Sequence, residues 1–410
     1  MLDKLYTLSR HYLEITNKPY CRLTYARNVF KPRLSILPGQ RGVGKTTLIV
    51  QYLLGQVQND LLSKEILYIP SDHFSLAGLS LYEIAEQFVQ LGGKIIAFDE
   101  IHKYSNWSQE LKSIYDTFPK LKIIASGSSA LEIHKGSHDL TRRAITYYIK
   151  GLSLREYLEL TTSNSFPVFS LDEILENHEK IAQQILNSLA KLEQKILPLF
   201  YQYLQTGYYP YFLDLKETAL FYTTLEQNFH VVIESDLATI YPSLTGHSIK
   251  KIKQLLSFIA QAVPFTPNWF KIKSIVDVSD DRTLKTYFKY LEDAGLIRMV
   301  NGYSKKMRQI EIPEKIYLEN TNQLYAISTE SSNIGTVRET FFLNTLSSNH
   351  EIRVPQKGDF IVNGKIVFEI GGKNKNYDQI KDEKSAYLAC DDIEQGIGNK
   401  IPLWLFGFLY

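Results

Sequence analysis

Short apolar runs alternate with longer segments of helical or polar pattern through residues 1–150. Each run is bounded by polar residues, which is typical of a buried strand. Because segments with helical periodicity separate the runs, the pattern predicts successive βαβ units and therefore a parallel sheet. The predicted strands cover residues 34–37, 66–69, 95–98, 121–125 and 145–149.

A helical pattern then continues into the middle of the chain. Ser153 and Glu156 have the spacing of a capping box, so a helix is predicted to begin near residue 153. Residues 171–204 keep a helical pattern throughout, and Gly207 followed by Pro210 would end it. We interpret this region as a helical lid or connector.

The carboxy-terminal part of the chain changes pattern twice. Between residues 249 and 316, three short helical segments, a stop at Gly295 and β-prone residues follow one another, an order that predicts a winged helix. After residue 320, a helix near 336–346 leads into β-hairpin sequence and the apolar run 401–410, which we interpret as a buried terminal strand. A chain of 410 residues exceeds the size at which one core stops growing, so two to four domains are expected.

The composition narrows the class of protein. Hydrophobic residues make up 44% and charged residues 22%, so apolar burial can offset chain entropy without metals or disulfides. Cys21 and Cys390 lie far apart, which gives neither a disulfide framework nor a zinc spacing and indicates a reducing compartment, by default the cytoplasm. Asp3 and Arg10 interrupt the amino-terminal apolar positions, and the run 401–410 is about half the ~20 residues of a membrane span. We therefore expect no membrane partner, and a net charge of +2 implies no other partner by itself.

A glycine-rich string follows the first predicted strand. Residues 39–46, GQRGVGKT, fit the Walker A spacing GxxxxGK[ST] and lead into the helical run 47–54. Glycines let the main chain wrap around phosphate oxygens, Lys45 adds a full charge, and the Thr46 hydroxyl suits Mg²⁺. The alternative is a chance glycine-rich turn between a strand and a helix. The predicted nucleotide-binding residues are Gly39, Gly42, Val43, Gly44, Lys45, Thr46 and Thr47.

The third predicted strand ends in two acidic residues, as a Walker B motif requires. Asp99 is expected to hold the magnesium shell, and Glu100 is placed to polarise the attacking water. The string IIAFDE alone would equally describe a strand end with solvated acids, but its position some fifty residues after the phosphate loop favours the nucleotide site. The predicted cofactors are therefore ATP and Mg²⁺.

Polar residues near the ends of the next two strands are further candidates. Ser126 and Ser128 follow the fourth predicted strand, where a side chain could sense the γ-phosphate or simply form a turn with a helix cap. Arg142 and Arg143 precede the last strand. Either could act as an arginine finger towards a neighbouring subunit, which would imply a homo-oligomer, or both could be solvated surface charges.

Three strings, FDEIHKYSNWSQELKSIYD, KIIASGSSALEI and LTRRAITYYIKGLSLREYLEL, together with the phosphate loop, resemble a group of prokaryotic AAA-family ATPases. The resemblance covers residues 34–160 specifically and continues more loosely through YLQTGYYP to the terminus. It implies that the acid pair, the polar residue after the fourth strand and the arginine before the last strand belong to the nucleotide site; in this chain they match Asp99, Glu100, Ser126 and Arg143. It also implies a carboxy-terminal half similar to the PD-(D/E)xK nuclease superfamily.

Pattern and resemblance together predict an α/β chain of several domains. A P-loop NTPase parallel sheet with helices on both faces is followed by a helical connector, a winged helix and a small α/β nuclease-like domain. The predicted boundaries are residues 1–160 for the AAA-type P-loop ATPase domain, 161–248 for the helical lid or connector, 249–318 for the winged helix and 319–410 for the PD-(D/E)xK-like domain.

The third helix of the predicted winged fold, residues 281–294, has one apolar and one basic side. Its apolar stripe consists of Leu284, Tyr287, Phe288 and Leu291, and Arg282, Lys285 and Lys289 lie opposite. Residues 250–308 contain twelve Lys or Arg and five Asp or Glu, an excess that suits contacts with DNA phosphates. A solvated helix face or a protein-docking surface is the alternative.

A partial nuclease signature lies further on. Glu339 on a predicted helix, Asp359 and Glu369 are similar to the nuclease core, where carboxylates hold a divalent ion and a lysine steadies the attacking water. A regular E-x-K would place the lysine at Gly371. On a continuing strand, Lys373 would still share a face with Glu369.

The register of the hairpin decides whether these carboxylates can meet. A two-residue turn at 363–364 would set Asp359 opposite Phe368 with its side chain on the wrong face. A three-residue loop that includes Lys365 would set Asp359 opposite Glu369 instead, and only this register could form a metal site. A structural or binding relic of a nuclease is the alternative.

The leading hypothesis is an ATP-hydrolysing AAA-type protein whose nucleotide state moves a carboxy-terminal half that engages nucleic acid. One rival is a nucleotide-switched signalling or scaffold protein that binds other proteins. Another is an ATP-gated nuclease. These three differ in the partner they predict, while all of them require a nucleotide.

Overall fold

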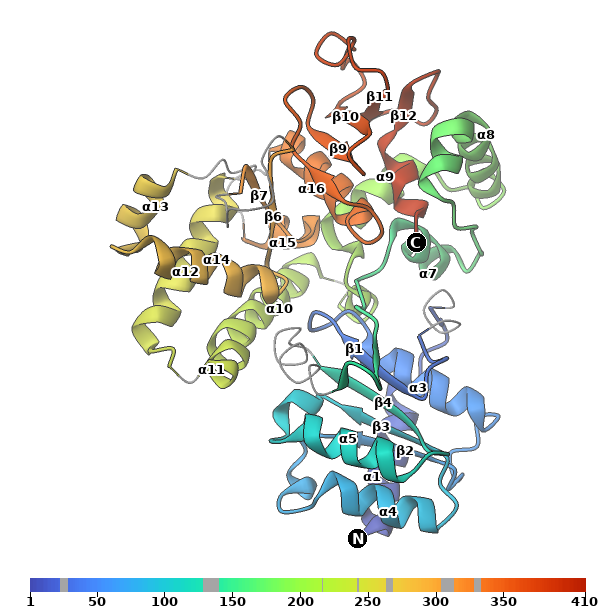
Figure 1. Cartoon of the computed structure of the whole chain (residues 1–410). Coiled ribbons are helices and arrows are strands. Elements are labelled where there is room, and N and C mark those ends of the chain that lie inside the picture. The colour runs from blue at the N-terminus through green and yellow to red at the C-terminus, as the bar shows by residue number, and fades with distance from the viewer. Residues whose placement is uncertain are drawn as a thin grey trace. The chain divides into compact units, whose positions relative to one another are not determined.

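The computed structural model describes residues 1–22, 29–127, 140–215, 217–241, 243–262, 268–303, 313–327 and 333–410. Within these ranges the chain forms two compact units, Met1–Gly151 and Leu152–Tyr410 (Figure 1). In the described residues the first unit has one sheet and the second has two, and each unit has its own helices. The further division of the second unit at residues 248 and 318 stays a prediction.

The first unit is built on a parallel sheet. In the described residues it has five strands in the order β2-β3-β4-β1-β5, and all the pairs are parallel. The βαβ pattern therefore predicted the sheet correctly. The strands are β1 (Leu34–Pro38), β2 (Ile66–Pro70), β3 (Ile95–Asp99), β4 (Lys122–Gly127) and β5 (Ile145–Thr146).

The last strand is shorter than the sequence predicts. β5 ends at Thr146, although the run of β-prone residues continues to Ile149. Tyr147 N–H still donates to the Ile36 carbonyl at 2.8 Å, and Ile149 N–H donates to the Pro38 carbonyl at 2.7 Å. The chain therefore continues alongside β1 and brings residues 147–151 close to the loop that follows β1.

Helices cover both faces of this sheet. α4 (Leu81–Gln90) and α5 (Trp107–Thr117) pack their apolar residues with Leu67, Phe98 and Ile123 in one core. α3 (Lys45–Gln56) contacts β3 and β4 with residues outside that core, and α1 (Leu2–Thr16) lies against β2. The predicted flanking of the sheet by helices is therefore confirmed.

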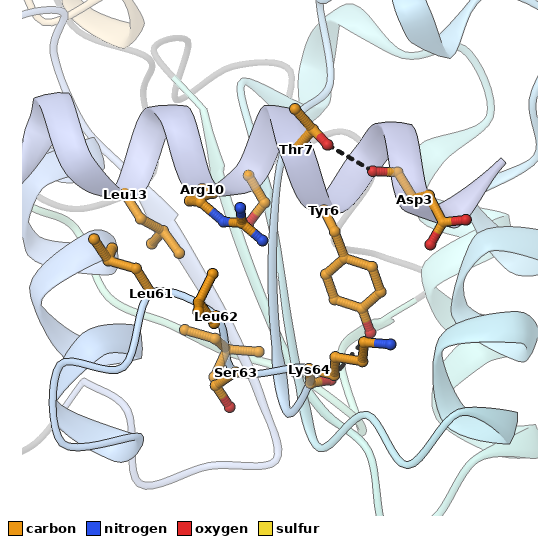
Figure 2. A pocket seen from close by; sticks show the side chains of 11 residues that line it. Asp3, Tyr6, Thr7, Arg10, Leu13, Leu61, Leu62, Ser63 and Lys64 are labelled. Carbon is orange, nitrogen blue, oxygen red and sulfur yellow. Dashed lines mark hydrogen bonds between the residues drawn. The ribbon is translucent and has the colours of Figure 1, made fainter.

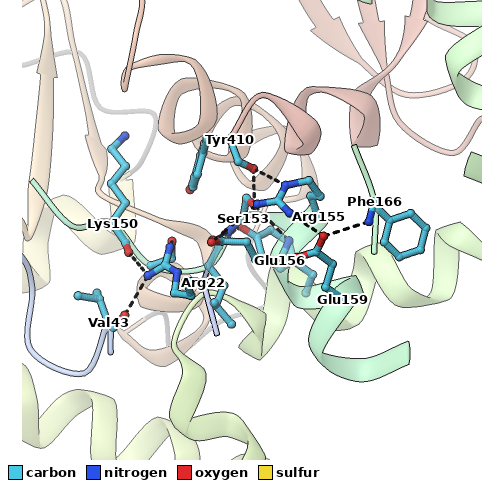
Figure 3. A network of polar contacts seen from close by, with 12 residues as sticks. Arg22, Val43, Lys150, Ser153, Arg155, Glu156, Glu159, Phe166 and Tyr410 are labelled. Atoms are coloured by element: carbon cyan, nitrogen blue, oxygen red, sulfur yellow. Dashed lines mark hydrogen bonds and ion pairs between the residues drawn. The ribbon is translucent and has the colours of Figure 1, made fainter. Parts of the chain in front are cut away.

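The second unit is mainly helical at its start. Its described helices are α7 (Leu154–Thr162), α8 (Leu171–Ala190), α9 (Ile196–Gln202), α10 (Thr218–Val231), α11 (Leu237–Ile240), α12 (Gly246–Ala262), α13 (Trp269–Val276), α14 (Asp281–Asp293), α15 (Thr321–Ile327) and α16 (Ile334–Leu346). The predicted capping box opens α7, because Ser153 Oγ accepts from Glu156 N–H and the Glu156 carboxylate accepts from Ser153 N–H. Ser153 Oγ also donates to the carbonyl of Tyr410 at 2.8 Å (Figure 3).

The prediction of one continuous helix over 171–204 was wrong. α8 ends at Ala190 and α9 begins at Ile196. In the intervening KLEQK segment the single apolar residue, Leu192, is exposed, and Glu193 adopts a left-handed φ of 56°. A helix needs an apolar face to pack, and this segment offers none.

Two small sheets complete the second unit. β6 (Ile297–Val300) and β7 (Lys315–Leu318) form an antiparallel pair. A mixed sheet follows, and its described strands have the order β12-β11-β10-β9-β8. Its strands are β8 (Ile352–Arg353), β9 (Phe360–Val362), β10 (Ile366–Gly371), β11 (Ala386–Cys390) and β12 (Lys400–Pro402).

The apolar carboxy-terminal run is buried, as predicted, but it is mostly not a strand. β12 takes only its first residues, and Leu403–Phe408 forms a 3-10 helix instead. All the residues of 401–410 are buried, with Phe406 packed against Phe342. Because this run is apolar on every side, its periodicity could not separate a strand from a buried helix. None of the helices in the described part of the chain combines the length and the apolar content that a membrane crossing requires.

Candidate nucleotide-binding site

The loop between β1 and α3 depends on its glycines. Gly42 and Gly44 adopt φ values of 84° and 90°, in the region that favours glycine, and Gly44 caps the amino terminus of α3. A Cβ atom on Gly39 would come within 2.4 Å of the Ile149 carbonyl oxygen. The loop can therefore follow this path only with these small residues, and it leaves the amino end of α3 facing the loop.

Lys45 points back into this loop. Its side chain is buried, and its Nζ donates to the carbonyl oxygens of Gly39 at 2.9 Å and Gln40 at 2.8 Å. These bonds hold the ammonium against the main chain of the loop. A phosphate group seated there would meet both the loop amides and this charge.

The Asp99 carboxylate is the centre of a hydroxyl network. It is 3% exposed and lies at the end of β3. Its Oδ2 accepts from Thr46 Oγ1 at 2.6 Å, and its Oδ1 accepts from the Ser126 hydroxyl and from Glu100 N–H. The structure thus brings together three residues that the sequence placed at the site, from α3, β3 and β4.

Sequence reasoning missed a fourth member of this network. The Tyr68 hydroxyl, from β2, donates to Asp99 Oδ2 at 2.6 Å. Burial, together with the adjacent Asp99 charge, raises the pKa of Tyr68 far above its usual value, so the hydroxyl keeps its proton and acts as a donor. The only sequence signal is a tyrosine within an otherwise aliphatic strand, ILYIP.

Glu100 lies beside the network in an unusual backbone conformation. Its φ of 51° and ψ of 39° are left-handed, which costs a non-glycine residue about 1–3 kcal/mol and is common at functional sites. Its Oε2 lies 3.6 Å from Nε2 of His102, a side chain that is only 1% exposed. His102 stands within the string FDEIHK, but its contact with Glu100 was not predicted.

The predicted arginines lie on the surface of the first unit. Arg143 forms a bidentate ion pair with Asp116 of α5, with both N–O distances 2.8 Å, and this hydrogen bonding lowers the pKa of Asp116. Arg142 is exposed. Ser128, the second serine candidate, lies outside the described residues.

A buried arginine that precedes β1 is hydrogen-bonded both to the phosphate loop and to the last residues of the first unit. Arg22 donates to the Val43 carbonyl at 3.1 Å, and to the carbonyls of Lys150 and Gly151 at 2.8 Å each (Figure 3). Val43 belongs to the loop, and Gly151 is the last residue of the first unit. No pattern in the sequence predicted this contact, because it joins segments more than 120 residues apart.

A cavity of about 200 Å³ lies elsewhere in this unit, between α1 and the segment before β2 (Figure 2). Tyr6, Arg10 and Lys64 are among its lining residues, and Tyr6 OH donates to the Lys64 carbonyl at 3.0 Å. Ile66, also in the lining, is the first residue of β2. The cavity is therefore at the amino-terminal edge of the sheet, whereas Asp99 is the last residue of β3 and the phosphate loop follows the carboxyl end of β1.

The predicted basic helix is present as α14 of the second unit. α14 buries Leu284, Tyr287, Phe288 and Leu291. Arg282 and Lys289 are exposed and Lys285 is partly exposed, while Lys289 Nζ lies 3.3 Å from the Asp293 carboxylate.

The carboxylates of the nuclease signature also come together. Phe360 pairs with Phe368 and Val362 with Ile366, so residues 363–365 form a three-residue loop and Asp359 falls opposite Glu369. This is the register that could bring the carboxylates to one face. Burial and the Asp359 charge both raise the pKa of Glu339, so these two groups are near each other.

The lysine next to this cluster is Lys375 rather than Lys373. β10 ends at Gly371, so the alternation that would carry Lys373 to the face of Glu369 does not continue, and Lys373 is exposed. Lys375 Nζ forms the ion pair with Glu369, and a Cβ on Gly371 would lie 2.7 Å from the Lys375 Cβ. The Lys375 side chain therefore lies next to Gly371, the position that the lysine occupies in a regular E-x-K signature.

A second lysine also enters the cluster. Lys315 Nζ, from β7, lies 3.3 Å from Glu339 Oε2 and 3.7 Å from Asp359 Oδ1. Tyr317 OH donates to Glu339 at 2.5 Å. In the part of the chain that the structure describes, no group of three His, Cys, Asp or Glu side chains is arranged to hold a metal ion.

Family models match two parts of the chain. Residues 31–158 match a family model described as an AAA domain, and residues 197–331 match a domain of unknown function. An uncharacterized protein of Methanocaldococcus jannaschii is 26% identical over 300 residues, which are 70% of this chain and 60% of that protein. The chain thus spans less than two thirds of that relative.

Among solved structures, a Walker-type ATPase of Pyrococcus abyssi is 14% identical, with 78% of this chain and 94% of that chain covered and a TM-score of 0.39. Domain III of the Thermotoga maritima replication initiation protein DnaA is 16% identical, with 50% and 93% covered and a TM-score of 0.25. Both TM-scores are low, so neither likeness bears on function. The family match, the parallel sheet and the phosphate loop together support an AAA-type P-loop domain at residues 31–158.

Proposed function

We propose that this chain binds ATP with Mg²⁺ and hydrolyses it at the site formed by the phosphate loop, Asp99 and Glu100. The observation that carries this proposal is the 2.6 Å bond between Thr46 Oγ1 and Asp99 Oδ2, which sets a hydroxyl from the loop beside a buried carboxylate. These are the hard oxygen donors that Mg²⁺ prefers, so the residues fit the ion. Thr46 and Asp99 would hold it, and the ion would neutralise charge on the phosphates.

The residues of the chain have distinct tasks in this proposal. The loop amides and the amino end of α3 bind the phosphates, and Lys45 places its ammonium among them. Glu100 orients the attacking water and accepts its proton. Ser126 is hydrogen-bonded to Asp99, which favours a role in holding that carboxylate over direct contact with the γ-phosphate.

Glu100→Gln tests the hydrolytic part of this proposal. We expect ATP binding to persist and phosphate release to fall by roughly two orders of magnitude or more, because the amide cannot accept the proton. Glu83→Gln on the exposed side of α4 is the matched control and should turn over ATP normally. Undiminished phosphate release from purified Glu100→Gln would refute the assignment of Glu100.

For the second unit we propose a nucleic-acid-engaging role that responds to nucleotide state. A winged helix is supported by the element order, which is α12, α13 and α14 followed by the antiparallel pair β6 and β7. Arg282 and Lys285 lie on the accessible side of α14. DNA affinity should fall steeply with salt and should weaken in Arg282→Ala/Lys285→Ala but not in the control Lys180→Ala/Lys191→Ala on and after α8. The absence of DNA binding at low salt would favour a nucleotide-switched protein that binds other proteins.

An ATP-gated nuclease is a second candidate, and the placement of Asp359 opposite Glu369 is the observation in its favour. The residues as arranged do not fit a metal ion, because Lys315 and Lys375 already neutralise the carboxylates. DNA incubated with the protein and Mg²⁺ or Mn²⁺ tests this candidate. Cleavage that is lost in Asp359→Ala would support it, while absent cleavage, or cleavage unchanged in that variant, would exclude this site.

Arg143 remains a proposed finger within a homo-oligomer. Its pairing with Asp116 would have to break for the guanidinium to reach a neighbouring nucleotide. A mass measurement with and without a non-hydrolysable ATP analogue tests this idea. A nucleotide-dependent oligomer would support it, and a monomer in both conditions would exclude it.

A further inference from the structure

The side chain of Asp99 is held from several directions at once. Oδ2 accepts from Tyr68 OH and Thr46 Oγ1, both at 2.6 Å, while Oδ1 accepts from Ser126 and from Glu100 N–H. Donors therefore approach both oxygens of the carboxylate, which has about four lone-pair sites when ionised. A carboxylate bonded in this way cannot rotate without breaking several hydrogen bonds.

The donors differ in what they could do when a cation is present. The Thr46 hydroxyl has one proton and two lone pairs, so it can donate to Asp99 and offer an oxygen to Mg²⁺ at the same time. Tyr68 approaches from β2 and is buried, and its hydroxyl donates the proton that helps to fix Oδ2. Its contribution is therefore to the orientation of Asp99 rather than to the ligand set.

The register of the sheet explains why Tyr68 can reach Asp99. Tyr68 pairs with Ala97 on the neighbouring strand, and Ala97 and Asp99 lie two residues apart on the same face. Ala97 carries only a methyl group, which leaves space beside it for the ring. The Tyr12 ring of α1 packs against the Tyr68 ring with centroids 5.5 Å apart, and Ser9 Oγ accepts from Tyr68 N–H at 2.9 Å.

We propose that Tyr68 is a positioning residue for the nucleotide-associated Mg²⁺, acting through the hydrogen bond from its hydroxyl to Asp99 Oδ2. The inference rests on the proposed ATP and Mg²⁺ function and adds a residue that motif analysis does not assign. Removing the hydroxyl leaves Oδ2 with one donor fewer in a buried place, so the carboxylate is held less firmly in its orientation. Binding of the triphosphate through the loop and Lys45 does not depend on this bond.

The experiment compares Tyr68→Phe with Tyr12→Phe in the full chain. Each variant loses one phenolic hydroxyl and keeps its ring, but only Tyr68 donates to Asp99, so Tyr12→Phe is the matched control. ATP binding is measured by calorimetry in EDTA, and the Mg²⁺ dependence of phosphate release is then measured at saturating ATP. Thermal unfolding of both variants checks that they fold.

In Tyr68→Phe we expect ATP affinity in EDTA to match the wild type and the half-saturating Mg²⁺ concentration to rise about tenfold, the effect of losing one hydrogen bond to a charged group. Tyr12→Phe should keep the wild-type Mg²⁺ requirement. A Tyr68→Phe curve that overlays the wild type, or an equal shift in both variants, would overturn the inference while leaving the proposed function intact. A folded wild-type protein that binds no ATP would overturn both.

Discussion

A carboxylate buried as deeply as Asp99 is stable only where donors replace the water it has lost. The strand-end motif predicted this residue because hydrophobic residues followed by two acids are a local pattern. Its partner Tyr68 could not be predicted, because their contact depends on the register between β2 and β3. Single-sequence reasoning thus found the residues of the site that lie in motifs and missed those that pairing brings in.

Ser126→Ala distinguishes the two roles that the sequence left open for this serine. If Ser126 acts through Asp99, as its hydrogen bond indicates, the variant should need several-fold more Mg²⁺ while its preference for ATP over ADP stays unchanged. Nucleotide competition and Mg²⁺ titration measure both quantities, and Ser113→Ala on the exposed side of α5 is the control. A changed ATP-to-ADP preference at a normal Mg²⁺ requirement would instead indicate direct contact with the γ-phosphate.

Replacing glycine by alanine should have opposite effects on the free energy of unfolding in the phosphate loop and inside α3. Gly39→Ala would push a methyl group to 2.4 Å from the Ile149 carbonyl oxygen, which should cost about 1–3 kcal/mol of unfolding free energy and distort the loop. Gly55→Ala, inside α3 with no atom within 4 Å of the new methyl, should stabilise by up to about 1 kcal/mol. Denaturant unfolding of both variants measures these opposite signs. Equal stabilities would show that the loop does not pack against residue 149 as described.

The elements that the sequence predicted well are those with an unambiguous period. The parallel strands and the stripe of α14 belong to this group. The run 401–410 has no such period because it is apolar on all sides, so its burial is compatible with either a strand or a helix. The position of Lys375 was missed for a related reason: a strand that ends at Gly371 cannot extend its alternation to residue 373.

Arg22 connects the phosphate loop directly to the residues that lead out of the first unit. Its guanidinium joins the Val43 carbonyl of the loop to the carbonyls of Lys150 and Gly151, and the second unit begins at the next residue. A change in loop conformation would therefore act on residues 150–151. The sequence could predict the nucleotide loop, but not this connection.

Hydrogen exchange tests this connection. In the wild type, addition of ATP and Mg²⁺ should alter the protection of amides at residues 147–151, and Arg22→Ala should remove that response because the three carbonyls are no longer joined. Arg10→Ala on the exposed side of α1 is the matched control. The contrary result is an unchanged response in Arg22→Ala at nucleotide concentrations that saturate the variant. That result would show that the phosphate loop and residues 147–151 are coupled by another route.

All the proposed roles require that the loop amides and Lys45 bind a nucleoside triphosphate. Calorimetric titration of the folded protein with ATP and Mg²⁺ tests it most directly. We expect saturable heat for the wild type and for the exposed-lysine control Lys64→Ala, and no saturable heat for Lys45→Ala. A folded wild type that gives no saturable heat with adenine or guanine nucleotides, or a Lys45→Ala variant that binds as tightly as the wild type, would contradict it.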